Sequence, residues 1–74
     1  MKYFLAEYKT VTGEHEYSEF GVLPASTWDN AEKRAIKGRK LFTRFGWEEC
    51  CFLDHIREIP RADYAVLKKY FAHV

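Results

Sequence analysis

Two adjacent cysteines, together with His15 and His55, are the residues of this 74-residue chain that could do chemistry. Cys50 and Cys51 point to opposite faces if they lie in a strand, so a disulfide between them would be strained. His55 lies four residues beyond Cys51, about 13 Å along a strand, which is too far for the imidazole to activate the thiol. A zinc site needs four ligands, and the sequence has no second cysteine pair. We therefore expect reduced thiols, no metal site and no cofactor.

Other common catalytic patterns are also missing from the sequence. Its two serines, Ser18 and Ser26, stand outside a nucleophile-elbow pattern. No glycine-rich loop is present that would cradle a phosphate. A chain of this length leaves little room for a closed pocket. We therefore expect no catalytic residues and no enzymatic activity.

Positive charge is concentrated in one segment. The net charge is +1, yet six of the 12 Lys and Arg residues lie within residues 33–46, which contain no acid. If this segment is helical, four cations fall on the side opposite its apolar residues: Lys33, Lys37, Lys40 and Arg44. This row predicts a site for an anionic partner, either an acidic protein surface or the phosphates of a nucleic acid. The alternative is a solvated helix face that binds nothing.

Acidic residues gather in the segment GEHEYSE. Glu14, Glu16 and Glu19 surround His15 and Tyr17 there. These carboxylates form either an acidic docking edge or an edge strand that charge protects from pairing with another strand. We favour the protected edge strand.

The spacing of apolar residues predicts a hairpin at the start of the chain. Residues 2–10 and 15–23 alternate as two strands, around a turn at 11–14 in which Gly13 can take a positive φ. The alternation slips in the second strand, so we expect Gly21 to form a β-bulge. Pro24 ends this strand.

A long amphipathic helix is expected next. Ser26 or Thr27 can cap it, and small or apolar residues follow at spacings of three and four: Trp28, Ala31, Ala35, Gly38, Phe42 and Phe45. This stripe predicts about five turns, with Gly38 allowing close approach to a sheet and Gly46 ending the helix. Residues 47–59 predict a third strand. Residues 61–74 predict a second helix with apolar residues on one face: Val66, Leu67, Tyr70, Phe71 and Val74.

Together these elements predict one α+β domain over residues 1–74, in the order β-β-α-β-α. We expect the third strand to pair with the first, which gives a three-stranded antiparallel sheet of order 2-1-3 with the long helix on one face. No apolar run approaches the ~20 residues that span a membrane, and the first residues lack a signal-peptide pattern. We therefore expect a cytoplasmic protein without membrane contact.

The segment YFLAEYKTVTGEHEYSEFGVLPASTWDNAEKRA, residues 3–35, resembles small accessory proteins of phages and other mobile elements, including some anti-CRISPR proteins. In those proteins an aromatic-rich hairpin leads through a short capped loop into a helix with regularly spaced alanines. The resemblance implies a binding role, such as host-directed inhibition, rather than catalysis. We expect a small non-catalytic protein that acts through protein–protein contacts, as a monomer or homodimer. Nucleic-acid binding through the basic helix face is the alternative.

Overall fold

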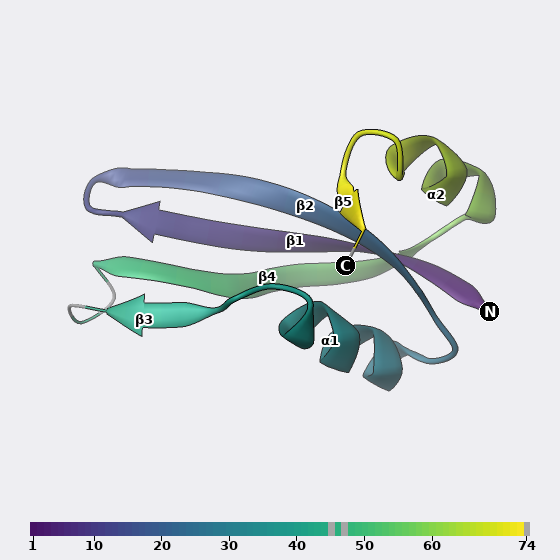
Figure 1. Cartoon of the computed structure of the whole chain (residues 1–74), viewed down its shortest axis with the longest axis horizontal. Helices are drawn as coiled ribbons and strands as arrows, with labels where there is room; N and C mark the ends of the chain where they lie inside the picture. Colours follow the sequence, from purple (N-terminus) through teal and green to yellow (C-terminus); the bar gives the residue numbers. More distant parts are fainter. Residues whose placement is uncertain (45, 47, 74) are drawn as a thin grey trace.

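The two long strands at the start of the chain form the hairpin at the centre of the fold. The computed structural model describes residues 1–44, 46 and 48–73 (Figure 1). Its elements follow in this order: β1 (Lys2–Thr12), β2 (His15–Ala25), α1 (Trp28–Lys37), β3 (Phe42–Arg44), β4 (Glu49–Ile59), α2 (Arg61–Leu67) and β5 (Ala72–His73). The predicted α+β class is confirmed. Neither described helix is long and apolar enough to cross a membrane.

The sheet has the strand order β3-β4-β1-β2-β5. Four of these strands pair antiparallel, and the two-residue β5 runs parallel to β2. The predicted pairing of the strand that follows the long helix with the first strand is confirmed, since β4 lies beside β1. The prediction of three strands was wrong, because Phe42–Arg44 and Ala72–His73 add a short strand at each edge.

Alternation along β1 places one set of its side chains under α1. Phe4, Ala6 and Tyr8 are buried on this face. They form the core with residues of β2 and α1: Leu23, Ala25, Ala31 and Ala35. The alanines of α1 are one helical turn apart, so their small side chains let the helix lie close to the sheet. At the start of α1, Trp28 packs edge-on against Phe4 with 5.1 Å between ring centroids.

α2 covers one end of the opposite face of the sheet. Tyr3 of β1 contacts Tyr64 of α2, with 4.5 Å between ring centroids. Phe20 of β2 contacts Phe71, which follows α2, at 5.3 Å. These two aromatic contacts anchor the C-terminal segment to the hairpin.

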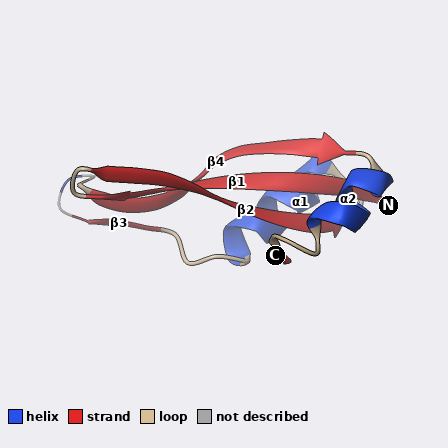
Figure 2. Cartoon of the chain, turned by 90° about the horizontal axis from the view of Figure 1, so that it is seen from above, coloured by secondary structure: helices blue, strands red, loops and turns tan. Residues whose placement is uncertain are grey.

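The sheet extends beyond both helices toward the β1–β2 turn (Figure 2). The molecule is accordingly elongated, with extents of 39 × 23 × 15 Å. At the turn, Gly13 takes the predicted positive φ, 62°. Its N–H donates to the carbonyl oxygen of Glu48 at 3.0 Å, which joins this turn to the β3–β4 connection. Strand pairing and this bond, rather than a helix, hold that end of the sheet.

α1 begins as the sequence predicts but ends earlier. Thr27 caps its start, because the Thr27 hydroxyl oxygen accepts from the N–H of Asn30 at 3.1 Å. The helix ends at Lys37 after 10 residues, so the prediction of about five turns was wrong. Phe42 lies on β3, opposite Cys51 of β4. The aromatic and β-branched residues after the helix suit a strand, and β4 offers them a partner.

Two glycines do not play the predicted roles in this region. Gly38 is the cap at the end of α1, with φ −73° and ψ −8°, rather than a residue of the helix interior. Gly46 lies in the β3–β4 connection with φ 61° instead of ending a helix. The predictions for Phe45 and for Trp47 fall outside the described residues.

α2 is also shorter than predicted. It ends at Leu67, and the chain then turns, with the N–H of Phe71 donating to the Leu67 carbonyl oxygen at 2.9 Å. The predicted helix over 61–74 was therefore wrong. The packing of Phe71 on Phe20 carries the chain across to β2, where β5 pairs. Val74 lies outside the described part of the chain.

Gly21 does not form a bulge. The β1–β2 register runs without a shift from Lys2 opposite Ala25 to Thr12 opposite His15. Gly21 is buried opposite Ala6, so its missing side chain keeps this position small under α1. The register shift occurs between β1 and β4 instead, between Glu7 and Tyr8.

Candidate functional site

Two of the four predicted cations lie on α1. Lys33 and Lys37 are exposed and stand four residues apart on the helix, so they project on the same side. Neither side chain forms an ion pair with a residue that the structure describes. Both ammonium groups are therefore available to a negatively charged partner.

The other two predicted cations are not on α1, so the prediction of one row on one helix was wrong. Lys40 is exposed in the connection between α1 and β3, and Arg44 ends β3. The Arg44 guanidinium lies 4.0 Å from the Glu49 carboxylate and 4.7 Å from the centroid of the Phe42 ring. The row is broken because α1 stops at Lys37.

An open groove of about 370 Å³ lies beside α1. It is lined by residue 1, the end of β2, the loop after β2 and one side of α1: Met1, Ala25, Ser26, Asn30, Lys33, Arg34 and Lys37. We call these residues the α1 groove. Three of them are cations, and no acid lines the groove among the residues that the structure describes. The groove is thus a concave, positively charged surface.

Hydrogen bonds hold the walls of the α1 groove in place. The Arg34 guanidinium donates to the carbonyl oxygen of Pro24 at 2.6 Å. The side-chain amide of Asn30 donates to the Ser26 hydroxyl oxygen at 2.9 Å. These bonds link α1 to the chain segment that precedes it.

Arg34 is a groove residue that sequence reasoning missed. Helical periodicity places it near the margin of the apolar stripe, where its stem covers the edge of the core. The groove exists only because the loop after β2 returns beside α1, and no local pattern reports that return. The one signal for the groove in the sequence was the position of Ser26 and Asn30 in the segment that caps the start of the helix.

The predicted acidic edge does not form one surface. Glu14 lies in the β1–β2 turn, whereas Glu16 and Glu19 lie on β2 three residues apart and so point to opposite faces. Glu16 lies 3.1 Å from the Lys9 ammonium, and this hydrogen bond raises the pKa of Lys9. Glu19 pairs with Arg39. Two of the three carboxylates are therefore matched by cations of the same chain.

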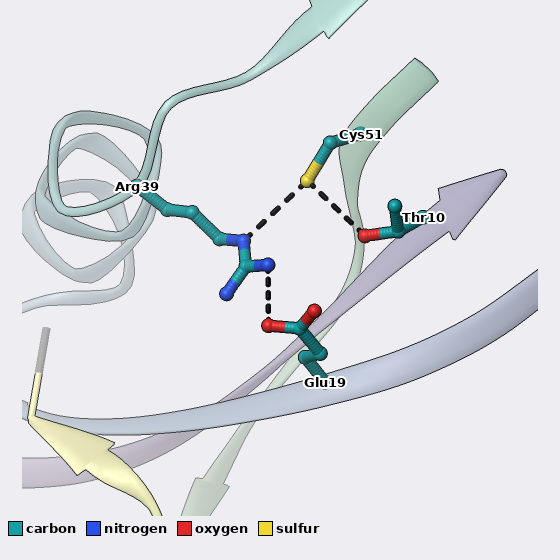
Figure 3. Close-up of polar contacts among 4 residues, drawn as sticks. All are labelled: Thr10, Glu19, Arg39 and Cys51. Atoms are coloured by element: carbon teal, nitrogen blue, oxygen red, sulfur yellow. Dashed lines mark hydrogen bonds and ion pairs between the residues drawn. The ribbon is translucent and has the colours of Figure 1, made fainter. Parts of the chain in front are cut away.

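Arg39 is the centre of a polar cluster on the α1 face of the sheet. It reaches from the connection after α1 toward β2 and β4 (Figure 3). Its Nε donates to the Cys51 sulfur at 3.4 Å, and its second terminal nitrogen pairs with Glu19. Thr10 donates its hydroxyl to the same sulfur at 3.5 Å. The bonds to Cys51 and to Glu19 raise the pKa of the Arg39 guanidinium.

The same guanidinium lies 5.3 Å from the centroid of the Tyr8 ring. Arg39 thus contacts the three central strands β1, β2 and β4 at once. The cluster has a structural task, because it fastens the connection after α1 to the sheet.

The cysteines are placed as the sequence predicts for a strand. Cys50 and Cys51 are both free and buried. Cys51 lies opposite Thr10, whereas His55 lies opposite Glu7 further along the strand, so thiol and imidazole are separated. Within the described residues, no three His, Cys, Asp or Glu side chains gather closely enough to hold a metal ion.

A second open pocket of about 260 Å³ lies on the face that carries α2. It is lined by both strands that flank β1 and by β1 itself: Leu5, Glu7, Phe20, His55 and Arg57. Sequence reasoning did not group these residues, because only the sheet register brings them together. The pocket combines both signs of charge with apolar side chains, so it favours no single class of ligand.

Comparison of the chain with protein-family models, with curated proteins and with solved structures found no match. The α1 groove and the charges around it are therefore the features that indicate a function. The resemblance to accessory proteins of phages stays a prediction.

Proposed function

We propose that this protein is a non-catalytic binding protein that docks an acidic surface of a partner protein against the α1 groove. One observation carries the proposal: Lys33, Arg34 and Lys37 line a single concavity that holds no acid among the described residues. Most cations that lie over the sheet instead form ion pairs with carboxylates of the same chain. Four such ion pairs join residues that the structure describes: Lys2–Glu58, Lys9–Glu16, Arg39–Glu19 and Arg44–Glu49.

The distribution of charge favours a protein partner over a nucleic acid. Binding along a nucleic acid needs cations spread over several successive phosphates. Because α1 ends at Lys37, Arg44 does not continue the row of cations on the helix, and a short cluster remains. The net charge of +1 is also small for a dedicated nucleic-acid module. A short cluster in a groove suits a local group of carboxylates or another compact anion.

The test compares two double charge reversals in the full chain. Lys33→Glu with Lys37→Glu changes the groove, and Arg61→Glu with Lys69→Glu changes exposed cations of α2 and the turn after it. Both variants lower the net charge equally. Each protein, immobilised, is exposed to a lysate of the cells that produce it, at about 50 and about 300 mM salt. Bound proteins are identified and re-tested in purified form.

We expect one purified acidic partner to bind the wild type and the α2 variant and to bind the groove variant at least about tenfold more weakly. Nuclease treatment of the lysate should leave this binding intact. Binding that disappears with nuclease would instead assign the groove to a nucleic acid. Equal binding by both variants would show that the α1 groove is not the docking surface.

A further inference from the structure

We propose that the α1 groove binds a phosphoryl group, carried on a phosphorylated side chain of the partner protein. This inference rests on the proposed function and specifies its ligand. It starts from the kinds of donor that the groove holds rather than from its total charge. These are a guanidinium, two ammonium groups, a hydroxyl and a carboxamide.

The guanidinium is held before any ligand arrives. Arg34 uses one terminal nitrogen to donate to the Pro24 carbonyl oxygen at 2.6 Å. A guanidinium has five N–H donors in a fixed plane, so this bond leaves donors for a ligand while it restrains the plane. A restrained fork pays less entropy when it binds a tetrahedral or planar oxyanion with two parallel bonds.

The neutral groups add donors to the same wall. The Ser26 hydroxyl oxygen accepts from the Asn30 side-chain amide at 2.9 Å. Because that oxygen is already an acceptor, the hydroxyl proton is left to donate elsewhere. Ser26, Asn30 and Arg34 all line the groove, and the two lysines stand on the adjacent turns of α1. A phosphoryl group, with three acceptor oxygens and nearly two negative charges, matches this set better than one carboxylate.

The lining also indicates which molecule carries the phosphoryl group. No aromatic side chain lines the groove among the described residues, so a nucleotide base would find no ring on which to stack. The one aromatic residue of α1, Trp28, packs against Phe4 on the core side. The groove is open, and its volume of about 370 Å³ lies near the lower end of the range for ligand pockets. A phosphorylated side chain that projects from a protein surface fits this shape.

The experiment titrates the isotopically labelled full chain with short peptides and follows backbone amide shifts by NMR. The probes are a phosphoserine flanked by two glycines on each side, the same peptide with serine, the same peptide with two adjacent glutamates in place of the serine, and adenosine monophosphate. The proteins are the wild type, Arg34→Lys and the control Arg61→Lys. Each is checked by thermal unfolding, so that a loss of binding is not confused with a loss of fold.

We expect the phosphoserine peptide to shift Ser26, Asn30 and Lys37 and to bind more tightly than the other three probes. Arg34→Lys keeps the charge but loses the fork, so it should weaken phosphopeptide binding by about tenfold, whereas Arg61→Lys should leave it unchanged. No histidine lines the groove among the described residues, so the phosphate, whose second pKa is about 6, should make binding tighter at about pH 7.5 than at about pH 5.

Several results would overturn the inference. Equal affinity for the phosphoserine and diglutamate peptides, with no effect of Arg34→Lys, would leave a groove for acidic surfaces without phosphoryl recognition, and the proposed function would stand. Tighter binding of adenosine monophosphate than of the phosphopeptide would assign the site to nucleotides. Absence of shifts in the groove with every probe, together with an unchanged groove variant in the partner assay, would remove both proposals.

Discussion

At the scale of single residues, Tyr8 ties the end of α1 to the central strand. Its side chain is 1% exposed, and its hydroxyl donates to the Ala35 carbonyl oxygen at 2.5 Å. That carbonyl belongs to the last turn of α1, where carbonyl groups lack helical partners. Tyr8→Phe should therefore lower the free energy of unfolding by about 1–2 kcal/mol in urea titrations. The exposed Tyr17→Phe is the control, and an equal loss in both variants would contradict this role.

The burial of Tyr8 predicts how stability changes in alkali. Burial raises the pKa of Tyr8 above its ordinary value of 10.0, although the nearby Arg39 charge acts in the opposite direction. The unfolded chain therefore releases this proton at a lower pH than the folded chain does. The contribution of Tyr8 is present below about pH 10 and is lost as the pH rises through the folded pKa. The difference in unfolding free energy between wild type and Tyr8→Phe should therefore shrink as the pH rises above about 10.

Arg39 donates a hydrogen bond to the Cys51 sulfur, so we expect it to shield this thiol. Arg39→Ala removes the donor to the Cys51 sulfur and the pair with Glu19. Because this ion pair is partly exposed, we expect a stability loss of only about 1–2 kcal/mol. The connection after α1 should open more often, so iodoacetamide should modify Cys51 about tenfold faster. Cys50, on the other face, is the internal control in peptide mass spectra; equal acceleration at both thiols would indicate global unfolding instead.

At the scale of elements, two glycines predict opposite responses to alanine. Gly13 has φ 62° in the β1–β2 turn, a conformation that costs other residues about 1–2 kcal/mol. Gly38 has φ −73° at the exposed end of α1, where alanine is the better helix residue by about 1 kcal/mol. Gly13→Ala should therefore lower the melting temperature, and Gly38→Ala should keep or raise it. If Gly38→Ala instead lowered the melting temperature, the result would support the close approach to the sheet that the sequence predicted.

The elements that were predicted correctly are those whose pattern is local. Alternation in β1 and the capped alanine spacing of α1 reflect burial against one neighbour, which periodicity reports directly. β3 and β5 have three and two residues, too few to show a period. They pair because tertiary structure brings an edge strand to them. The end of α1 was missed for the same reason, since Phe42 continues the helical spacing yet contacts β4.

At the scale of the whole molecule, the candidate site combines residues that the sequence could predict with residues that only the path of the chain brings together. Lys33 and Lys37 could be found from helical periodicity, because exposure opposite the alanines follows from the helix alone. Arg34 shares a surface with Lys33 and Lys37 only because the loop after β2 lies beside α1. Arg44 lies apart from them because α1 ends before it. Charge along the sequence therefore located the segment, whereas the path of the chain determined which cations share a surface.

The same path leaves one end of the sheet covered by helices and the other end without such cover. Core residues Phe4, Ala6 and Tyr8 lie under α1, whereas neither α1 nor α2 covers the end of the sheet at the β1–β2 turn (Figure 2). Low burial makes local opening less costly. Amide protons of Phe4–Tyr8 should therefore exchange with deuterium at least about tenfold more slowly than those of Val11–Thr12, after correction for intrinsic rates.

The bond from Gly13 to Glu48 links the two strand connections at this end of the sheet and works against such opening. Gly13→Ala strains the turn that presents this N–H, so it should speed exchange at Val11–Thr12 more than exchange at Phe4–Tyr8. The measurement is exchange of the full chain under native conditions, with wild type and variant side by side. Uniform protection along β1 in the wild type, or a uniform loss in the variant, would show instead that the whole sheet opens as one cooperative unit.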